Sequence, residues 1–342
     1  MSLVIWIVVF KILIRFFYIY VDDSFSFEDK RYMEFYAPYQ KSLPSNMVKL
    51  LCLWDAIGLP HEERKQVYGL ELPIIGFDVN PNLMQARMSD ESRTRLIQEL
   101  IDFAQRGSRH SLKDFQHLAG WLNWALNVYP LLQPGLSALY AKTAGKLVLK
   151  ALIWVNRDVV RELEWVIGHL RSAEGVFFFK SISWSFSNRP TDVLKVYTDA
   201  SGVGMVYWFP DLNIGFQSHL PGSAPTGTIF YYEALAVTST LLDAANRLDP
   251  EHRVAVFTDN LNTVAMFNSL AALPPYNWLL IESVDTVLST KIDFHVFFML
   301  GIHNTVADHL LRWKNAEAMI VSPGLTISPF EPPQNTLGAA RK

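Results

Sequence analysis

The sequence predicts an α/β protein in which short strands alternate with helices. From about residue 193 onward, three strand-like apolar segments are followed by a helix, a strand, two helices, a strand and a last helix. Before that point, amphipathic helical patterns dominate, with apolar residues three and four positions apart. The chain of 342 residues is 50% hydrophobic and 13% aromatic, so it has the length for two or three domains and is too apolar to be disordered or fibrous.

Charge and cysteine content exclude several classes of protein. The chain has 30 Lys+Arg against 33 Asp+Glu, and a net charge of −3 gives no general attraction to nucleic acid or to anionic membranes. Any basic surface must therefore be local. The single cysteine, Cys52, excludes an internal disulfide and a cysteine-rich zinc site. We expect an intracellular protein, cytoplasmic or nuclear, that is not secreted.

The segment Leu3–Tyr20 is nearly continuous apolar sequence and approaches the length of a membrane span. Lys11 and Arg15 interrupt it, and each cation near mid-bilayer costs about 2.5 to 3.5 kcal/mol. A signal peptide would need a basic stretch before the apolar run and small residues after it, and neither is present. A membrane anchor is one interpretation. We favour the other, a buried helix followed by a buried strand that ends at Tyr20, with no membrane partner.

The next segments contain recognisable helix boundaries. An amphipathic pattern over Met47–Gly58 predicts a helix that Gly58 stops, and Leu72–Val79 predicts a short strand pair. Ser89 is expected to cap one helix and Ser111 the next, which should end by Pro130.

Phe103–Arg157 is a basic segment within an acidic protein, because its seven cations are opposed by one acid, Asp114. Lys142, Lys146 and Lys150 are four positions apart, so on a helix they would form one stripe suited to following a phosphate backbone. The alternative is an ordinary solvated helix face.

A new domain is expected to begin near residue 190, and it ends before a Pro-rich segment without periodicity that we expect to be a disordered tail. The predicted elements are strands at Val193–Tyr197, Val203–Phe209 and Ile214–His219, a helix at Ile229–Leu248, a strand at Val254–Thr258, helices at Thr263–Leu270 and Asn277–Leu288, a strand at Ile292–Leu300 and a helix at Thr305–Lys314.

Four carboxylates lie at element ends or first turns in this domain: Asp199, Glu233, Asp259 and Asp308. Taken singly, each could be a helix cap or a surface residue. An unpaired buried charge is costly, however, and a cluster of four would repel itself without a divalent cation. Two such ions about 3.5 to 4 Å apart form the clamp used for in-line phosphodiester chemistry.

These acids lie in motifs that resemble the ribonuclease H domain of retroelement reverse transcriptases. The motifs are TDAS-x-x-G from Thr198, YYEALA from Tyr231, FTDN from Phe257 and G-x-H-N-x-x-AD-x-L-x-R from Gly301. The resemblance implies that the four acids bind two Mg²⁺, or Mn²⁺, to cut the RNA strand of an RNA/DNA hybrid. It also implies that Ser201 and Asn260 contact the hybrid backbone. The alternative is that either residue satisfies a turn. His303 is either part of the site or an ordinary loop residue.

The beginning of the chain resembles the polymerase part of the same enzymes. YVDD at Tyr20–Asp23 matches the catalytic turn, which would make Asp22 and Asp23 metal ligands. Lys65 matches a lysine of the segment before the primer grip, and Gly76 falls in the primer-grip hairpin. The helix after Ser111 looks like the thumb helix, which gives the basic segment a role in holding template-primer. The match runs from about residue 4 to 312 and is most similar to DIRS-type and gypsy-type elements.

The resemblance predicts an α+β polymerase remnant followed by a ribonuclease H-like mixed five-stranded sheet with flanking helices. In that family the fingers and the first half of the palm precede YVDD and supply another catalytic aspartate. Upstream polymerase domains are therefore a further expected partner. We therefore expect this chain not to polymerise DNA alone. The remaining alternatives are a non-catalytic truncated retroelement copy and a membrane-anchored protein. The expected regions are a partial palm (1–88), thumb-like helices (89–150), a connection (151–190), the ribonuclease H-like domain (191–315) and the tail (316–342).

Overall fold

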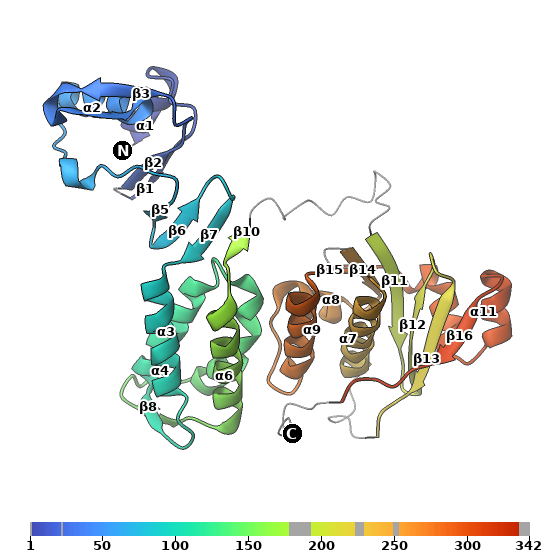
Figure 1. Cartoon of the computed structure of the whole chain (residues 1–342). Coiled ribbons are helices and arrows are strands. Elements are labelled where there is room, and N and C mark those ends of the chain that lie inside the picture. Colours follow the sequence, from blue (N-terminus) through green and yellow to red (C-terminus); the bar gives the residue numbers. More distant parts are fainter. Residues whose placement is uncertain (1, 22, 178–192, 223–228, 249–252, 335–342) are drawn as a thin grey trace. The chain divides into compact units, whose positions relative to one another are not determined.

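The computed structural model describes residues 2–21, 23–177, 193–222, 229–248 and 253–334 (Figure 1). The chain divides into two compact units. The first contains Met1–Arg95 and Glu174–Ser183, and the second contains Leu96–Ala173 and Trp184–Lys342. The boundaries of the smaller regions remain predictions.

The first unit begins with helix α1 (Ser2–Phe10) and the antiparallel hairpin β1 (Phe17–Tyr20) and β2 (Asp23–Ser26). The predicted order of helix and strand is confirmed, but the predicted burial is wrong. Within Leu3–Tyr20 only Val8 and Ile14 are buried, and they pack with Leu50. Among the described residues, no helix has both the length and the apolar character needed to cross a bilayer.

A second small cluster forms around helix α2 (Ser45–Ile57), which Gly58 ends in a left-handed conformation (φ 70°), as predicted. It follows the hairpin β3 (Met33–Tyr36) and β4 (Lys41–Pro44), joined by the short helix η1 (Ala37–Tyr39). Tyr36 is buried in this cluster, and its hydroxyl donates to Asp55 Oδ2 (2.6 Å). The turn η2 (Glu63–Lys65) comes next.

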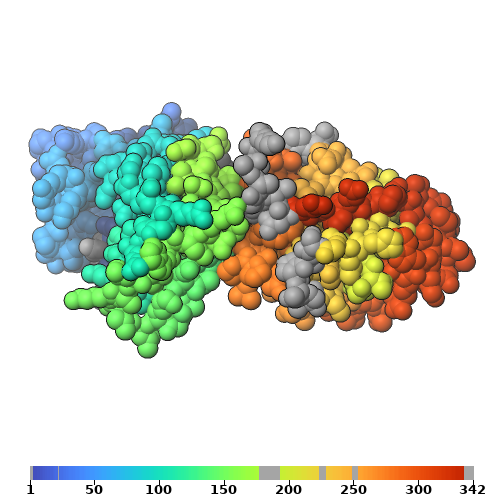
Figure 2. All heavy atoms as spheres, turned by 90° about the horizontal axis from the view of Figure 1, so that it is seen from below, coloured from blue at the N-terminus to red at the C-terminus, as the bar shows by residue number. Residues whose placement is uncertain are grey.

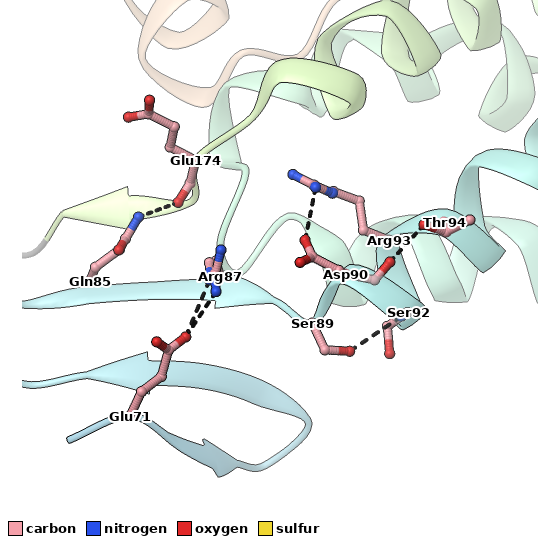
Figure 3. Close-up of polar contacts among 9 residues, drawn as sticks. All are labelled: Glu71, Gln85, Arg87, Ser89, Asp90, Ser92, Arg93, Thr94 and Glu174. Carbon is pink, nitrogen blue, oxygen red and sulfur yellow. Dashed lines mark hydrogen bonds and ion pairs between the residues drawn. The ribbon is translucent and has the colours of Figure 1, made fainter. Parts of the chain in front are cut away.

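A four-stranded antiparallel sheet completes the unit, in the order β10 (Val176–Phe177), β7 (Gln85–Met88), β6 (Phe77–Asn80), β5 (Leu72–Ile74). The predicted strand pair is therefore confirmed. Figure 3 shows Arg87 on β7 bound to Glu71, and the side chain of Gln85 bound to the carbonyl of Glu174. Beyond β7, Ser89 Oγ accepts from the Ser92 N–H at the start of α3 (Asp90–Phe103), which is the predicted cap.

The second unit contains a helical part and a sheet. Ser111 caps α4 (Leu112–Ala125) through a reciprocal capping box with Asp114, and α4 ends before Pro130 as predicted. The other elements of this part are β8 (Arg109–Ser111), η3 (Pro130–Leu136), α5 (Ser137–Thr143), β9 (Leu152–Trp154) and α6 (Arg157–Ser172), with β8 and β9 paired antiparallel.

The sheet of the second unit has six strands among the described residues, in the order β15-β14-β11-β12-β13-β16. Strands β11 and β14 are parallel, as are β14 and β15, whereas β12 is antiparallel to both of its neighbours. The sheet is mixed, as predicted. Its elements before the last strand are β11 (Val193–Ala200), β12 (Gly204–Phe209), β13 (Ile214–His219), α7 (Ile229–Arg247), β14 (Arg253–Thr258), α8 (Leu261–Ser269), α9 (Asn277–Thr290), β15 (Asp293–Phe298), η5 (Gly301–His303) and α10 (Thr305–Leu311).

Helices cover both faces of this sheet. The larger core lies between one face and α7, α8 and α9, and Figure 1 shows α7 and α9 side by side there. The smaller core lies on the opposite face, where α10 packs against Val206 and Trp208 of β12. Alternate residues of β12 therefore point into different cores.

The prediction of a disordered tail over residues 316–342 is wrong for the described part of that segment, and residues 335–342 lie outside the described residues. Residues after 314 form α11 (Asn315–Val321) and the sixth strand β16 (Thr326–Pro329), which pairs parallel to β13. Figure 2 shows this red segment against the yellow strands. Ala318 and Leu325 are buried in the smaller core, so the hydrophobic contact supplies what the sequence periodicity does not show.

The helical part and the sheet of the second unit are joined by buried polar contacts. Glu162 of α6 is fully buried, and its carboxylate accepts from the Ala138 N–H (2.6 Å) and from Asn277 Nδ2 (2.8 Å) at the start of α9. Burial raises the pKa of Glu162 to about 7. Trp165 Nε1 also donates to Asp285 Oδ1 of α9 (2.7 Å). Residues 130–172 are therefore part of the environment in which the sheet domain folds.

Candidate metal centre

Three of the four predicted acids meet at one edge of the six-stranded sheet. Asp199 is the next-to-last residue of β11, Asp259 directly follows β14, and Glu233 lies early in α7. Because β11 and β14 are parallel and in register, their carboxyl ends lie side by side. One carboxylate oxygen from each acid lies within 4.8 Å of the others. The topology thus brings together residues that are up to 60 positions apart.

Glu233 is held rigidly by hydrogen bonds from both strands. It is 2% exposed. The Ala200 N–H donates to its Oε1 (3.1 Å), and the Thr258 hydroxyl donates to its Oε2 (3.1 Å). Thr258 Oγ1 in turn accepts from the Asn260 N–H (3.2 Å). These contacts position the carboxylate between β11 and β14.

The electrostatics of the cluster favour a bound cation. Burial raises the pKa of Glu233 to about 8, and the neighbouring Asp199 adds to the rise. Burial also raises the pKa of Asp199 to about 7, with further contributions from Asp259 and Asp308. Ionising the whole cluster therefore requires compensating positive charge. Three carboxylates are the hard oxygen ligands that Mg²⁺ and Mn²⁺ prefer, so the donor set fits the predicted metal.

A close backbone contact fixes the third carboxylate. A Cβ at Gly301 would lie 2.7 Å from Asp259 Oδ2, which is closer than real contacts allow. A side chain at position 301 would have to push the Asp259 carboxylate aside.

Asp308 lies beside the three acids, but it is not among the residues whose carboxylate oxygens lie within 4.8 Å of one another. It is in the first turn of α10, and Arg312 Nε donates to its Oδ1 (2.8 Å). Its charge contributes to the raised pKa of Asp199. The structure therefore brings three members of the predicted quartet together and places the fourth next to them.

Sequence reasoning missed the residue that attaches α10 to the sheet. Asn304 is buried, and its Nδ2 donates to the carbonyl oxygen of Thr198 (3.0 Å), next to Asp199. Its Oδ1 is buried without a hydrogen-bond partner in the described part of the chain. The sequence does contain a signal for this residue, because Asn304 belongs to the same motif as Asp308.

The two predicted backbone-contact residues both make turn contacts. Ser201 Oγ accepts from the Val203 N–H (3.3 Å), and Asn260 Oδ1 caps α8 by accepting from the N–H groups of Asn262 and Thr263 (both 3.1 Å). Their predicted contact with nucleic acid remains a prediction. His303 is exposed in the short helix η5.

The predicted polymerase residues lie in the first unit. Of the YVDD segment, Tyr20 ends β1 and pairs with Asp23 at the start of β2, and Asp23 is exposed. Asp22 lies outside the described residues. Gly76 (φ 82°) and Ile75 (φ 52°) form the tight turn between β5 and β6. Lys65 is exposed in η2, with its Nζ 3.5 Å from Glu62 Oε1.

The predicted lysine stripe is wrong. Only Lys142 lies on a helix, because α5 ends at Thr143 and Gly145 takes a left-handed conformation (φ 71°). Lys146 and Lys150 follow in exposed non-helical chain. A spacing of four is compatible with a helix, but the glycine between the lysines ends it. A role in nucleic-acid binding would have to come from a cationic loop.

Comparison with known proteins adds little beyond the geometry. No protein-family model matches the chain, and no curated protein matches it. One similar solved structure is that of "the foamy viral protease-reverse transcriptase dRH in complex with ds DNA", with 14% identity and a TM-score of 0.22. The likeness covers 86% of this chain and 49% of that one, so this chain spans about half its length. At this identity and TM-score the likeness supports no assignment of activity.

Proposed function

We propose that the acidic cluster at the carboxyl ends of β11 and β14 is a divalent-metal site that hydrolyses the RNA strand of RNA/DNA hybrids. The observation that carries the proposal is the convergence of Asp199, Glu233 and Asp259 within 4.8 Å. Burial raises the pKa of Asp199 and of Glu233, in agreement with it. A purely structural role would favour residues that do not repel one another at this edge. The motif resemblance to retroelement ribonuclease H supplies the substrate class.

The acidic cluster and its neighbours have distinct roles in the proposed reaction. Asp199, Glu233 and Asp259 would hold Mg²⁺, with Asp308 as the further ligand of a second ion. Bound divalent ions supply a nucleophilic water at neutral pH and stabilise the leaving oxygen. Ala200 and Thr258 keep Glu233 oriented, and Arg312 pairs with Asp308. Ion binding must release the protons held by Glu233 and Asp199, so metal affinity rises with pH.

The test is cleavage of an end-labelled RNA/DNA hybrid by the full chain in Mg²⁺. The full chain is required because α6 and β16 both pack with the sheet domain. We expect the RNA strand to be cut, and Asp259→Asn to reduce the rate at least 100-fold. The matched control is Asp211→Asn, an exposed acid beyond the other end of β12. Equal loss in both variants, or no cutting by a folded chain, would leave the non-catalytic relic as the better interpretation.

Primer extension is not expected from the YVDD hairpin. Asp23 is exposed in this hairpin, and the further catalytic aspartate that the family resemblance implies belongs to a separate strand of the palm. Extension of a primed template by the full chain, lost in Asp23→Asn, would show this reasoning to be wrong.

A further inference from the structure

An exposed pair of stacked rings lies near the acidic cluster and has no part in the chemistry described above. The indole of Trp313 stacks on the imidazole of His219, with ring centroids 4.6 Å apart and planes inclined by 22°. Trp313 follows the end of α10, and His219 is the last residue of β13. Trp313 is 45% exposed and His219 is also exposed, so the pair offers a flat surface to a ligand.

The strand register places this pair at the same end of the sheet as Asp199. Asp199 is opposite Val206 on β12, and His219 is opposite Gly204, two residues nearer the start of β12. Two strand spacings and two residues of rise put His219 about 12 Å from Asp199. That distance is about three to four base-pair steps of a duplex, at about 3.4 Å a step.

The pair also lies on the same face as Asp199. Residues opposite each other on neighbouring strands point to one face, as do alternate residues along a strand. Asp199, Val206, Gly204 and His219 therefore share a face, which is the face that α10 covers. Trp313 lies over this face, because its Nε1 is 3.9 Å from the position of a Cβ on Gly204.

Local structure fixes the backbone from which the ring of Trp313 projects. The residue has a positive φ (58°), which side-chain-bearing residues rarely adopt, and its N–H donates to the carbonyl of Leu310 (3.0 Å). A Cβ at position 204 would lie 2.8 Å from the Ser218 carbonyl oxygen, so glycine is required beneath the indole. Asp308, Arg312 and Trp313 thus belong to one short rigid segment.

We propose that Trp313 and His219 form a stacking platform for the sugar rings of a nucleic-acid duplex whose scissile phosphate lies at the carboxylates. The inference rests on the proposed function and adds the residues that would hold the substrate beside the cut. The acidic cluster repels phosphates in the absence of metal. Affinity for the duplex close to the cluster must therefore come from side chains that contact parts of the duplex other than its phosphates. Aromatic rings can provide such affinity without sequence preference, because a ring face packs on the apolar surface of a sugar and does not contact the base.

The experiment measures binding separately from cleavage. The full chain carrying Asp259→Asn is titrated into a fluorescein-labelled RNA/DNA hybrid, and the dissociation constant is obtained from anisotropy at several salt concentrations. We expect Trp313→Ala to weaken binding about tenfold and His219→Ala about threefold, while Trp313→Phe stays within threefold of the parent. The salt slope of Trp313→Ala should equal that of the parent, because this substitution removes no charge. The control is Ile320→Ala, a 78% exposed apolar side chain on α11.

The outcomes separate this inference from the proposed function. In the chain with an intact cluster, Trp313→Ala should raise KM about tenfold and leave kcat within threefold. Parent-like binding by Trp313→Ala and His219→Ala would overturn the platform even if Asp259→Asn abolishes cleavage. Weaker binding by these variants, in a chain that binds hybrid but does not cut it, would support the platform and refute the nuclease. No hybrid binding by the parent would overturn both. If Trp313→Ala does not fold, His219→Ala and Trp313→Phe decide the question.

Discussion

Replacing Glu233 by Gln should stabilise the metal-free protein at alkaline pH. Glutamine keeps the shape of the side chain and can still accept from the Ala200 N–H, while Thr258 Oγ1 can accept from the new amide. The substitution removes a buried negative charge next to Asp199. Its effect on unfolding free energy therefore reports the electrostatic strain of the empty site.

The size of the effect follows from the raised pKa. The pKa of Glu233 rises from its usual 4.5 to about 8 on folding. Between these values the folded state holds more protons than the unfolded state, so stability falls as pH rises. Each pH unit between the two pKa values corresponds to about 1.4 kcal/mol, which sets a ceiling on the order of 5 kcal/mol. Because Asp199 shares the strain, we expect the variant to be more stable by about 2 to 4 kcal/mol at pH 9 and by less than about 1 kcal/mol at pH 5.

The assay is urea unfolding of both proteins in EDTA at pH 5, 7 and 9, repeated with Mg²⁺. Glu162, whose pKa is also raised, contributes equally to both proteins and cancels in the difference. Mg²⁺ should stabilise the wild type more than the variant, since it binds only the intact cluster in the folded state. The control is Glu164→Gln, the same change at an exposed position of α6. A difference that does not grow with pH, or that Glu164→Gln reproduces, would refute the reasoning.

Three further predictions concern the surroundings of the site. Gly301→Ala should lower the apparent Mg²⁺ affinity at least tenfold, because its Cβ would displace the Asp259 carboxylate; calorimetric titration checks this, and Gly222→Ala, with open space around it, is the control. Asn304→Ala should cost about 1 to 2 kcal/mol of unfolding free energy and reduce cleavage as well, and a variant that loses neither would show that the bond to Thr198 is dispensable. Ending the chain after residue 314 should destabilise the second unit by at least about 3 kcal/mol, since β16 and the burial of Leu325 are lost; unchanged melting of the shortened chain would contradict the packing described.

The sequence predicted the order of elements in the sheet domain because their ends carry local signals. Glycine, proline and aspartate separate β11, β12 and β13. The predicted limits of α7 and of β14 each differ from the observed ones at one end, by one residue. Carboxylates at strand ends are also local features. Their convergence could be expected because parallel strands place their carboxyl ends at one edge.

Other features depend on contacts that no local pattern encodes. Strand β16 contains Pro329 and shows no alternation, and it forms a strand because β13 offers an unpaired edge and Leu325 finds a hydrophobic core. The prediction of a lysine stripe was wrong for the opposite reason. A local signal was present, because the glycine between the lysines ends the helix that their spacing suggests. The buried amide of Asn277 likewise finds Glu162 and the Pro134 carbonyl more than 100 positions away.

Helix α10 connects these distant contacts to the chemistry. Asn304, directly before α10, donates to the Thr198 carbonyl of β11. The face of α10 that is turned toward the sheet packs on β12, and Asp308 lies in the first turn of the helix. The same face contacts Ala318 and Leu325, so the segment expected to be a tail supports the position of a candidate metal ligand. Perturbing β16 should therefore reduce metal affinity as well as stability, although β16 contains no member of the acidic cluster.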